Sequence, residues 1–130
     1  MKPDESRMPP CNLIAEKSVL GGLMIEVDKV DDIAPLIRAD DFHREPHRVV
    51  FTAMLAMRDA GKPINTIALA DELDRLEKLD EIGGVLFLNK LMEAVPSNGN
   101  ANIAYDAKLV REAAQRRSVI YAARDLEAAA

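Results

Sequence analysis

The sequence has no tryptophan, a single cysteine and only two tyrosines and three phenylalanines among its 130 residues. A core must therefore be built mainly from aliphatic side chains and methionine. The lone Cys11 cannot form an internal disulfide or a cysteine-based metal site. No apolar run approaches the roughly 18–20 residues of a membrane span, and residues 1–10 lack the apolar stretch of a signal peptide. We therefore expect a cytoplasmic protein with no membrane partner.

A surplus of positive charge is also lacking. The sequence has 17 Lys and Arg residues against 22 Asp and Glu residues, so its net charge is −5. A free-standing nucleic-acid-binding domain usually needs a surplus of cations to neutralise phosphates. Hydrophobic residues make up 48% of the chain, which is typical of a globular domain rather than a disordered one. The length suits one domain with a modest core of its own.

Strand-like alternation of apolar and polar residues is absent, whereas helical spacing recurs along the chain. The sequence therefore predicts an all-α fold, a small orthogonal bundle of about five helices plus one long protruding C-terminal helix. We divide it into a disordered lead-in at 1–11, a helical head at 12–99 and the long helix at 100–130. The expected head helices cover residues 13–25, 28–37, 46–59, 66–77 and 85–94.

The first head helix carries two adjacent glycines, Gly21 and Gly22, inside an apolar pattern that includes Ile14, Val19 and Leu23. Glycine inside a helix costs about 0.5–1 kcal/mol relative to alanine. We interpret the pair as a place where another backbone packs closely, and we expect the helices at 46–94 to surround this one.

Two other apolar stripes define which helix faces should be buried. We expect the helix at 66–77 to bury one face, and the first half of the long helix to bury another. The residues of these two stripes are Ile67, Ala70, Leu73 and Leu76, and then Ile103, Ala107, Val110 and Ala114.

The second half of the long helix has an apolar face that nothing else in the chain is left to cover. Its residues are Val119, Ile120, Ala123 and Leu126, and they follow a polar interruption at 115–118. A helix of about 28 residues is roughly 42 Å long, so it must extend past a small head. We therefore expect the next element of a longer chain to pack on this face, and we expect protein–protein contact rather than catalysis.

Catalytic and metal-binding patterns are weak. His43 and His47 have a helical metal-ligand spacing, but Pro46 separates them, so we interpret them as a polar turn before a helix. The only Gly-Lys pair, at Gly61, follows a helix and is closed by a proline, which does not fit a P-loop. Ser18 has no base nearby in the sequence. We predict no catalytic, nucleotide-binding or metal site in this chain.

Several separate blocks resemble the opening of replicative hexameric DNA helicases of the DnaB type, in order and spacing from about residue 12 onward. They are AEKSVLGGLM at 15–24, DDF at 40–42, PHR at 46–48, VF at 50–51, PIN at 63–65, LADEL at 69–73, IGG at 82–84, PS at 96–97, ANIAY at 101–105 and LVRE at 109–112. Asn12 and Leu13 depart from the family's usual start.

The resemblance implies the N-terminal domain of such a helicase, with the long helix as the first arm of a helical hairpin. The ATPase motor, which binds ATP and Mg²⁺ and makes most of the DNA contacts, would lie further along the parent chain. In the family these domains form a collar of three dimers on the hexameric ring. The collar recruits the C-terminal domain of primase and helps to line the path of the lagging-strand template.

Positions carried over from the family give two sets of candidate contacts. The subunit-interface candidates are Val119, Ile120, Ala123 and Leu126, and the candidates for a primase or neighbouring-subunit contact are Tyr105, Leu109, Arg116 and Arg117. We expect the fragment to dimerise and the parent to form a hexamer. The alternative is a helical module that contacts single-stranded DNA through Arg and Lys on the arm, with no primase role.

Overall fold

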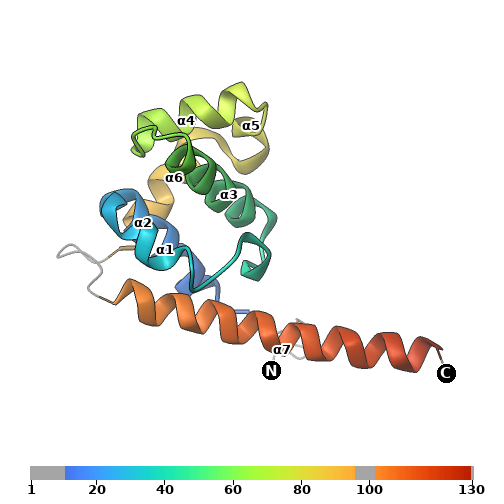
Figure 1. The fold of residues 1–130 in the computed structure, drawn as a ribbon. Coiled ribbons are helices and arrows are strands. Elements are labelled where there is room, and N and C mark those ends of the chain that lie inside the picture. The colour runs from blue at the N-terminus through green and yellow to red at the C-terminus, as the bar shows by residue number, and fades with distance from the viewer. Residues whose placement is uncertain (1–10, 96–101, 130) are drawn as a thin grey trace.

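The computed structural model describes residues 11–95 and 102–129, and every regular element within these ranges is a helix (Figure 1). The α-helices are α1 (Leu13–Ile25), α2 (Val30–Ile33), α3 (Glu45–Asp59), α4 (Thr66–Arg75), α5 (Leu79–Ile82), α6 (Gly84–Glu93) and α7 (Ile103–Ala129), with 3-10 turns η1 (Val27–Lys29) and η2 (Ala39–Asp41). The helix α7 runs along one side of the head and continues past it, whereas α4 and α5 lie at the opposite side (Figure 1). The expected helical head with one protruding helix is confirmed.

The helix α1 forms the centre of the head. The Asn12 side chain caps it by accepting a hydrogen bond from the Ala15 N–H at 3.0 Å. It packs against α3, α6 and α7, so the long helix belongs to its surroundings as much as the head helices do. Ile14 is 83% exposed, and its assignment to the buried stripe was wrong because the buried face is centred on Val19, Leu20 and Leu23.

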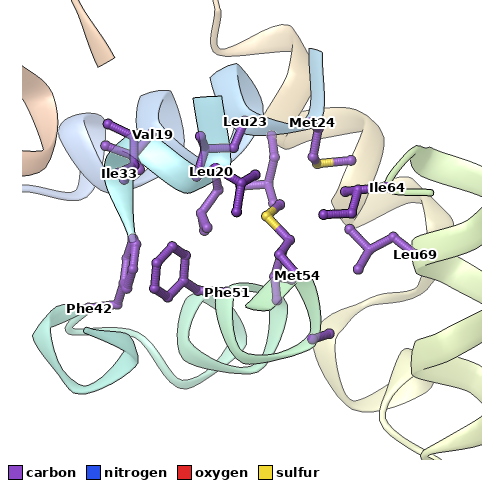
Figure 2. Packing of buried hydrophobic residues seen from close by; sticks show 14 of the residues in the cluster. Val19, Leu20, Leu23, Met24, Ile33, Phe42, Phe51, Met54, Ile64 and Leu69 are labelled. Carbon is purple, nitrogen blue, oxygen red and sulfur yellow. The ribbon is translucent and has the colours of Figure 1, made fainter. Parts of the chain in front are cut away.

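The core is filled by side chains from elements that are distant in the sequence. In Figure 2, Leu20 and Leu23 of α1 face Phe51 and Met54 of α3, and all four are fully buried. The ring centroids of Phe42 and Phe51 lie 5.2 Å apart, which extends the core beneath the loop before α3. Aliphatic and methionine side chains make up most of this cluster, as the composition predicts.

Gly21 is a point where two backbones touch. A Cβ atom added there would lie 2.0 Å from the Leu91 carbonyl oxygen of α6 and 2.9 Å from Val95 Cγ2. No side chain can be accommodated at that distance from a backbone oxygen. The interpretation of this glycine as a close-packing position is therefore confirmed.

The second predicted helix, at 28–37, is much shorter than expected. The chain forms η1 and the single-turn α2, and α2 ends at Ile33. Pro35 has no N–H with which to extend the helical ladder, and the Leu36 N–H instead closes a turn on the Ile33 carbonyl at 2.8 Å. The proline thus ends this helix.

The buried face of α4 also differs from the predicted stripe. Leu69 and Leu73 are fully buried, whereas Ile67 is 83% exposed and Leu76 is 44% exposed. The helix ends at Arg75, and Glu77 then adopts a positive φ of 60°. A stripe shifted by one or two positions fits the sequence almost as well, because α4 has apolar residues on several sides.

The long helix α7 has 27 residues, close to the expected length. On its head side it buries Ile103, Ala107, Val110 and Ala113, so Ala113 takes the place expected for Ala114. Its last buried residue is Arg117. Residues 1–10 of the predicted lead-in at 1–11 lie outside the described residues, as do residues 100 and 101 at the start of the predicted long helix.

We expect Gly21→Ala to lower the free energy of unfolding by about 1–3 kcal/mol, because an added methyl group must push α1 away from α6. Helix propensity alone would raise stability by about 1 kcal/mol, so the sign of the effect tests the contact. Chemical denaturation monitored by circular dichroism measures it.

The control is Ala56→Gly at an exposed position of α3, which should lower stability by about 1 kcal/mol through propensity alone. A Gly21→Ala variant that is more stable than the unmodified chain would show that α1 and α6 are not in close contact.

Candidate functional site

The arm, which we define as residues 118–129 of α7, extends beyond the head with its apolar residues uncovered. Val119 is 69% exposed and Leu126 is 73% exposed. Ala123 is also exposed, and Ile120 is partly buried. The four residues predicted for the subunit interface are thus accessible to a partner. That they bind a second subunit stays a prediction.

Tyr105, Leu109 and Arg116 lie on the first part of α7, beside the head. Tyr105 is 62% exposed and Arg116 is exposed. Leu109 is partly buried and packs against the core cluster. These three residues remain candidates for a contact with primase or with a neighbouring subunit.

Arg117, the fourth of these candidates, is buried within the chain instead. It is only 6% exposed, and its Nη2 donates a hydrogen bond to the Asp41 carbonyl oxygen at 2.7 Å. The helix turns this side chain toward the head, since Ala113 lies four residues earlier on the buried face. Arg117 therefore fixes α7 to the head, and we withdraw it from the candidates for a partner contact.

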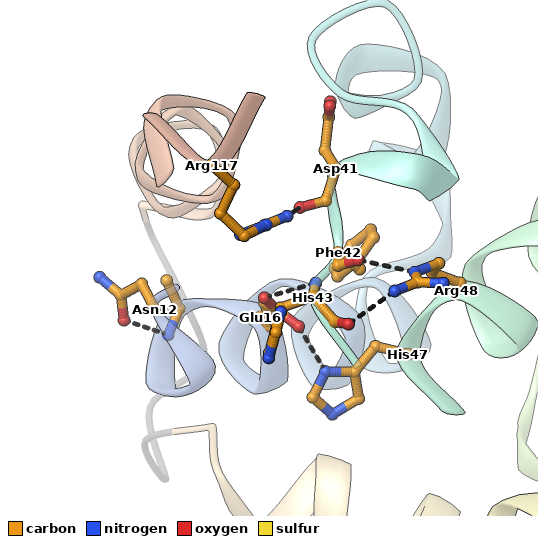
Figure 3. Close-up of polar contacts among 9 residues, drawn as sticks. Asn12, Glu16, Asp41, Phe42, His43, His47, Arg48 and Arg117 are labelled. Carbon is orange, nitrogen blue, oxygen red and sulfur yellow. Dashed lines mark hydrogen bonds and ion pairs between the residues drawn. The ribbon is translucent and has the colours of Figure 1, made fainter. Parts of the chain in front are cut away.

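The loop at 41–43, which accepts the hydrogen bond from Arg117, also contacts a buried carboxylate on α1 (Figure 3). Glu16 is 1% exposed and accepts two hydrogen bonds, one from His47 Nδ1 at 2.7 Å and one from the His43 N–H at 2.9 Å. His47 is fully buried, and its ring stacks on Phe87 of α6 with centroids 5.9 Å apart. This pair joins α1 to the start of α3.

Arg48 of α3 completes the set of contacts around the same loop. Its guanidinium donates to the Phe42 carbonyl oxygen at 2.9 Å and to the His43 carbonyl oxygen at 2.7 Å. We call Glu16, His47, Arg48 and Arg117, together with the loop at 41–43, the polar node. Side chains from α1, α3 and α7 thereby satisfy consecutive backbone groups of one loop, as a partly buried backbone requires.

The polar node was not predicted from the sequence. His43 and His47 were interpreted as a polar turn before a helix, and no role was predicted for Glu16. The sequence does contain a pattern that predicts the node. Glu16 lies at helical spacing from Val19 and Leu20, and His47 lies at helical spacing from Val50. A charged residue on the apolar face of one helix and a histidine on that of another predict a buried pair.

The carboxyl group of Glu16 responds to this environment. Burial raises its pKa, whereas the hydrogen bonds from His47 and from the backbone at His43, with the attraction of His47, lower it. The lowering effects prevail, and the pKa lies below its ordinary value of 4.5. Glu16 is therefore ionised at neutral pH and stabilises the node.

Within 11–95 and 102–129, no three His, Cys, Asp or Glu side chains gather where they could hold a metal ion. Lys62, beside Gly61, pairs with Glu72 at 3.1 Å, and the Ser18 hydroxyl donates to Asp106 at 2.9 Å. No helix in this part of the chain is both long and apolar enough to cross a membrane.

A cleft of about 510 Å³ lies where α7 leaves the head, between the middle of α7 and the loop after α2. Arg38, Arg111 and Tyr121 are among its lining residues, together with Asp40 and Asp41. The mixed charges make it a polar groove next to the node.

The fold first defines a class, an all-helical head that carries one long and partly uncovered helix. A family model described as the DnaB-like helicase N-terminal domain matches residues 8–112. The crystal structure of the N-terminal domain of DnaB helicase from Mycobacterium tuberculosis superimposes with a TM-score of 0.86 at 37% identity, covering 91% of this chain and 81% of that one. The chain therefore belongs to the DnaB-like helicase N-terminal domain family.

Curated relatives agree with this assignment. The chain is 37% identical over 116 residues to the replicative DNA helicase DnaB of Leifsonia xyli subsp. xyli, and 39% identical over 119 residues to that of Mycobacterium leprae. These alignments cover 89% and 92% of this chain but only 25% and 19% of the relatives. The chain thus spans a quarter or less of the length of the helicases it matches.

We expect stability to fall in acid as the node loses its charge. A carboxyl whose pKa is lowered by folding contributes stability that is complete above the ordinary value, here 4.5, and is lost as pH falls through the folded-state pKa. The pKa of Glu72 is lowered by hydrogen bonds from Arg75 and Lys62, so this residue contributes to the same loss of stability in acid.

Glu16→Gln should therefore lower stability at pH 7 and flatten its decline below pH 4.5. Urea denaturation at a series of pH values measures both effects. Glu72→Gln provides the comparison, because it should remove only its own share of the slope. If the free energy of unfolding of Glu16→Gln declined in acid as steeply as that of the unmodified chain, the role assigned to this carboxylate would be refuted.

Proposed function

We propose that this chain is the assembly and docking domain of a replicative DNA helicase. It associates with copies of itself through the arm, and it docks the C-terminal domain of primase during DNA replication. ATP, Mg²⁺ and most of the DNA would be bound by the motor domain of the parent chain, which would form a hexamer in the cytoplasm. The membership of the chain in the DnaB-like family supports this proposal.

The observation that carries the proposal is the uncovered apolar side of the arm. The buried residues of α7 end at Arg117, so the head completes its core without the arm. Val119 and Leu126 are large apolar side chains that are held in water by a regular helix. Covering them would gain about 25 cal/mol per Å² of apolar surface, which favours association with another protein.

Leu126→Glu should weaken self-association at least tenfold, a change of about 1.4 kcal/mol, because the carboxylate would be buried at the interface. Helix content and unfolding should hardly change, since the arm lies outside the core. Sedimentation equilibrium measures the association, and circular dichroism measures the helix content.

Ala128→Glu is the matched control, because it adds the same charge on a different side of the arm, and it should leave association nearly unchanged. If Leu126→Glu unfolded the head, the arm would have to be folded back on it. If the unmodified chain remained monomeric at high micromolar concentration, the self-association would be refuted.

Primase docking has a separate test. Titration of the chain with the isolated C-terminal domain of primase, followed by calorimetry, should give a saturable heat with micromolar or tighter affinity, about −8 kcal/mol or more. Heats no larger than those of dilution would refute docking by this domain and leave the self-association untouched.

A further inference from the structure

The cleft of about 510 Å³ between the middle of α7 and the loop after α2 differs in charge from the chain as a whole. Three arginines and two aspartates line it, whereas the whole chain carries a net charge of −5. The charged lining residues are Arg38, Asp40, Asp41, Arg111 and Arg117. An acidic protein thus has a small surplus of positive charge in this cleft.

Two of these five residues already hold the walls of the cleft in place. Arg117 donates a hydrogen bond to the Asp41 carbonyl oxygen at 2.7 Å (Figure 3), and the Asp41 carboxylate accepts one from the Arg38 N–H at 2.8 Å. Among the described residues, the side chains of Arg38, Asp40 and Arg111 form no ion pair. These three charges can therefore meet a ligand.

The two available guanidinium groups come from opposite walls of the cleft. Arg38 lies in the loop after α2, and Arg111 lies on α7, where its Nη1 is 3.5 Å from the carbonyl oxygen of Leu36. Both arginines are exposed. A guanidinium offers several N–H donors in a planar fork that matches the oxygens of a phosphate or carboxylate. The pair favours a ligand that carries such an anionic group.

The remaining lining residues suit a base and a sugar. Tyr121 is 43% exposed and presents an aromatic ring, over which Arg124 lies 5.8 Å from the centroid. An aromatic ring of this kind can stack with a nucleobase. Gln115, Ser118 and Asp40 supply hydrogen-bond donors and acceptors for hydroxyl and amino groups. The volume lies within the range of roughly 300–1,000 Å³ that is typical of small-molecule sites.

The acidic groups limit how much negative charge the ligand can carry. Asp40 and Asp41 lie in the same lining as the two available arginines. Each further phosphate would be repelled by these carboxylates, so one phosphate is favoured over three. A nucleic-acid strand needs a continuous cationic track along its backbone, which a chain with a net charge of −5 is poorly suited to supply.

We propose that this cleft binds a nucleoside monophosphate, with the phosphate between Arg38 and Arg111 and the base against Tyr121. The bound nucleotide contacts both the head and α7, so it reinforces the attachment of the long helix. The site has no P-loop, because its two walls come from distant segments rather than from one local motif. The inference depends neither on the proposed self-association nor on primase docking.

A titration with AMP, followed by amide chemical shifts in nuclear magnetic resonance, tests the site. The shifts should be concentrated at 35–41 and 111–121 and should saturate with a dissociation constant of about 1 mM or tighter. Arg38→Ala and Arg111→Ala should each raise this constant at least about tenfold, because each removes a charged donor from the phosphate. Circular dichroism should show that both variants are folded, since both positions are exposed.

Lys108→Ala is the matched control. It removes one positive charge from an exposed position of α7 that does not line the cleft. The dissociation constant for AMP should then change less than about twofold, since a distant exposed charge is screened by solvent. A loss of affinity as large as that of the two arginine variants would show an effect of overall charge and refute the cleft as the site.

Adenosine and inorganic phosphate test the two halves of the ligand. Each should bind at least about tenfold more weakly than AMP. If phosphate alone bound as tightly as AMP, the nucleotide would be refuted as the ligand. A single-stranded oligonucleotide that saturates the site while AMP does not would also overturn the proposal. If AMP caused no saturable shifts up to about 10 mM, the site would be refuted, and the proposed function would stand unchanged.

Discussion

One buried carboxylate holds the loop to which the long helix α7 is hydrogen-bonded. Glu16 fixes the loop at 41–43 through the His43 N–H and holds His47 in the core. The same loop then offers its Asp41 carbonyl oxygen to Arg117 of α7. Because polar groups that are buried without partners are costly, these contacts stabilise one another. The node therefore couples the packing of the head to the position of the long helix.

This coupling matters for any contact that the chain makes. The helix α7 is hydrogen-bonded to the head at Arg117 and uncovered beyond it, and Figure 1 shows its far half continuing past the head. Partners that bind such a helix meet a preorganised surface, and association then costs less conformational entropy than binding to a mobile segment.

The sequence allowed the all-α class, the bounds of α3 and α7 and the close packing at Gly21 to be predicted. Each depends on local rules, namely helical spacing, the places where proline and glycine are tolerated, and the steric cost of a Cβ atom. Buried faces were predicted less well, as Ile14 and Ile67 show. Each lies on a helix with apolar residues on several sides, and only the neighbouring elements decide which side is covered.

For the candidate contact residues on α7, too, some properties follow from the sequence and others only from the tertiary structure. The sequence by itself determined that α7 is one uninterrupted helix, since residues 102–130 contain no glycine or proline and are rich in strong helix formers. It also determined the spacing of the residues along that helix. Only the tertiary structure decided that Arg117 points into the head while Arg116 points into water, and that Glu16 and His47 form a pair 31 positions apart. Helical geometry is local, whereas burial of a charged group depends on partners brought together by the whole fold.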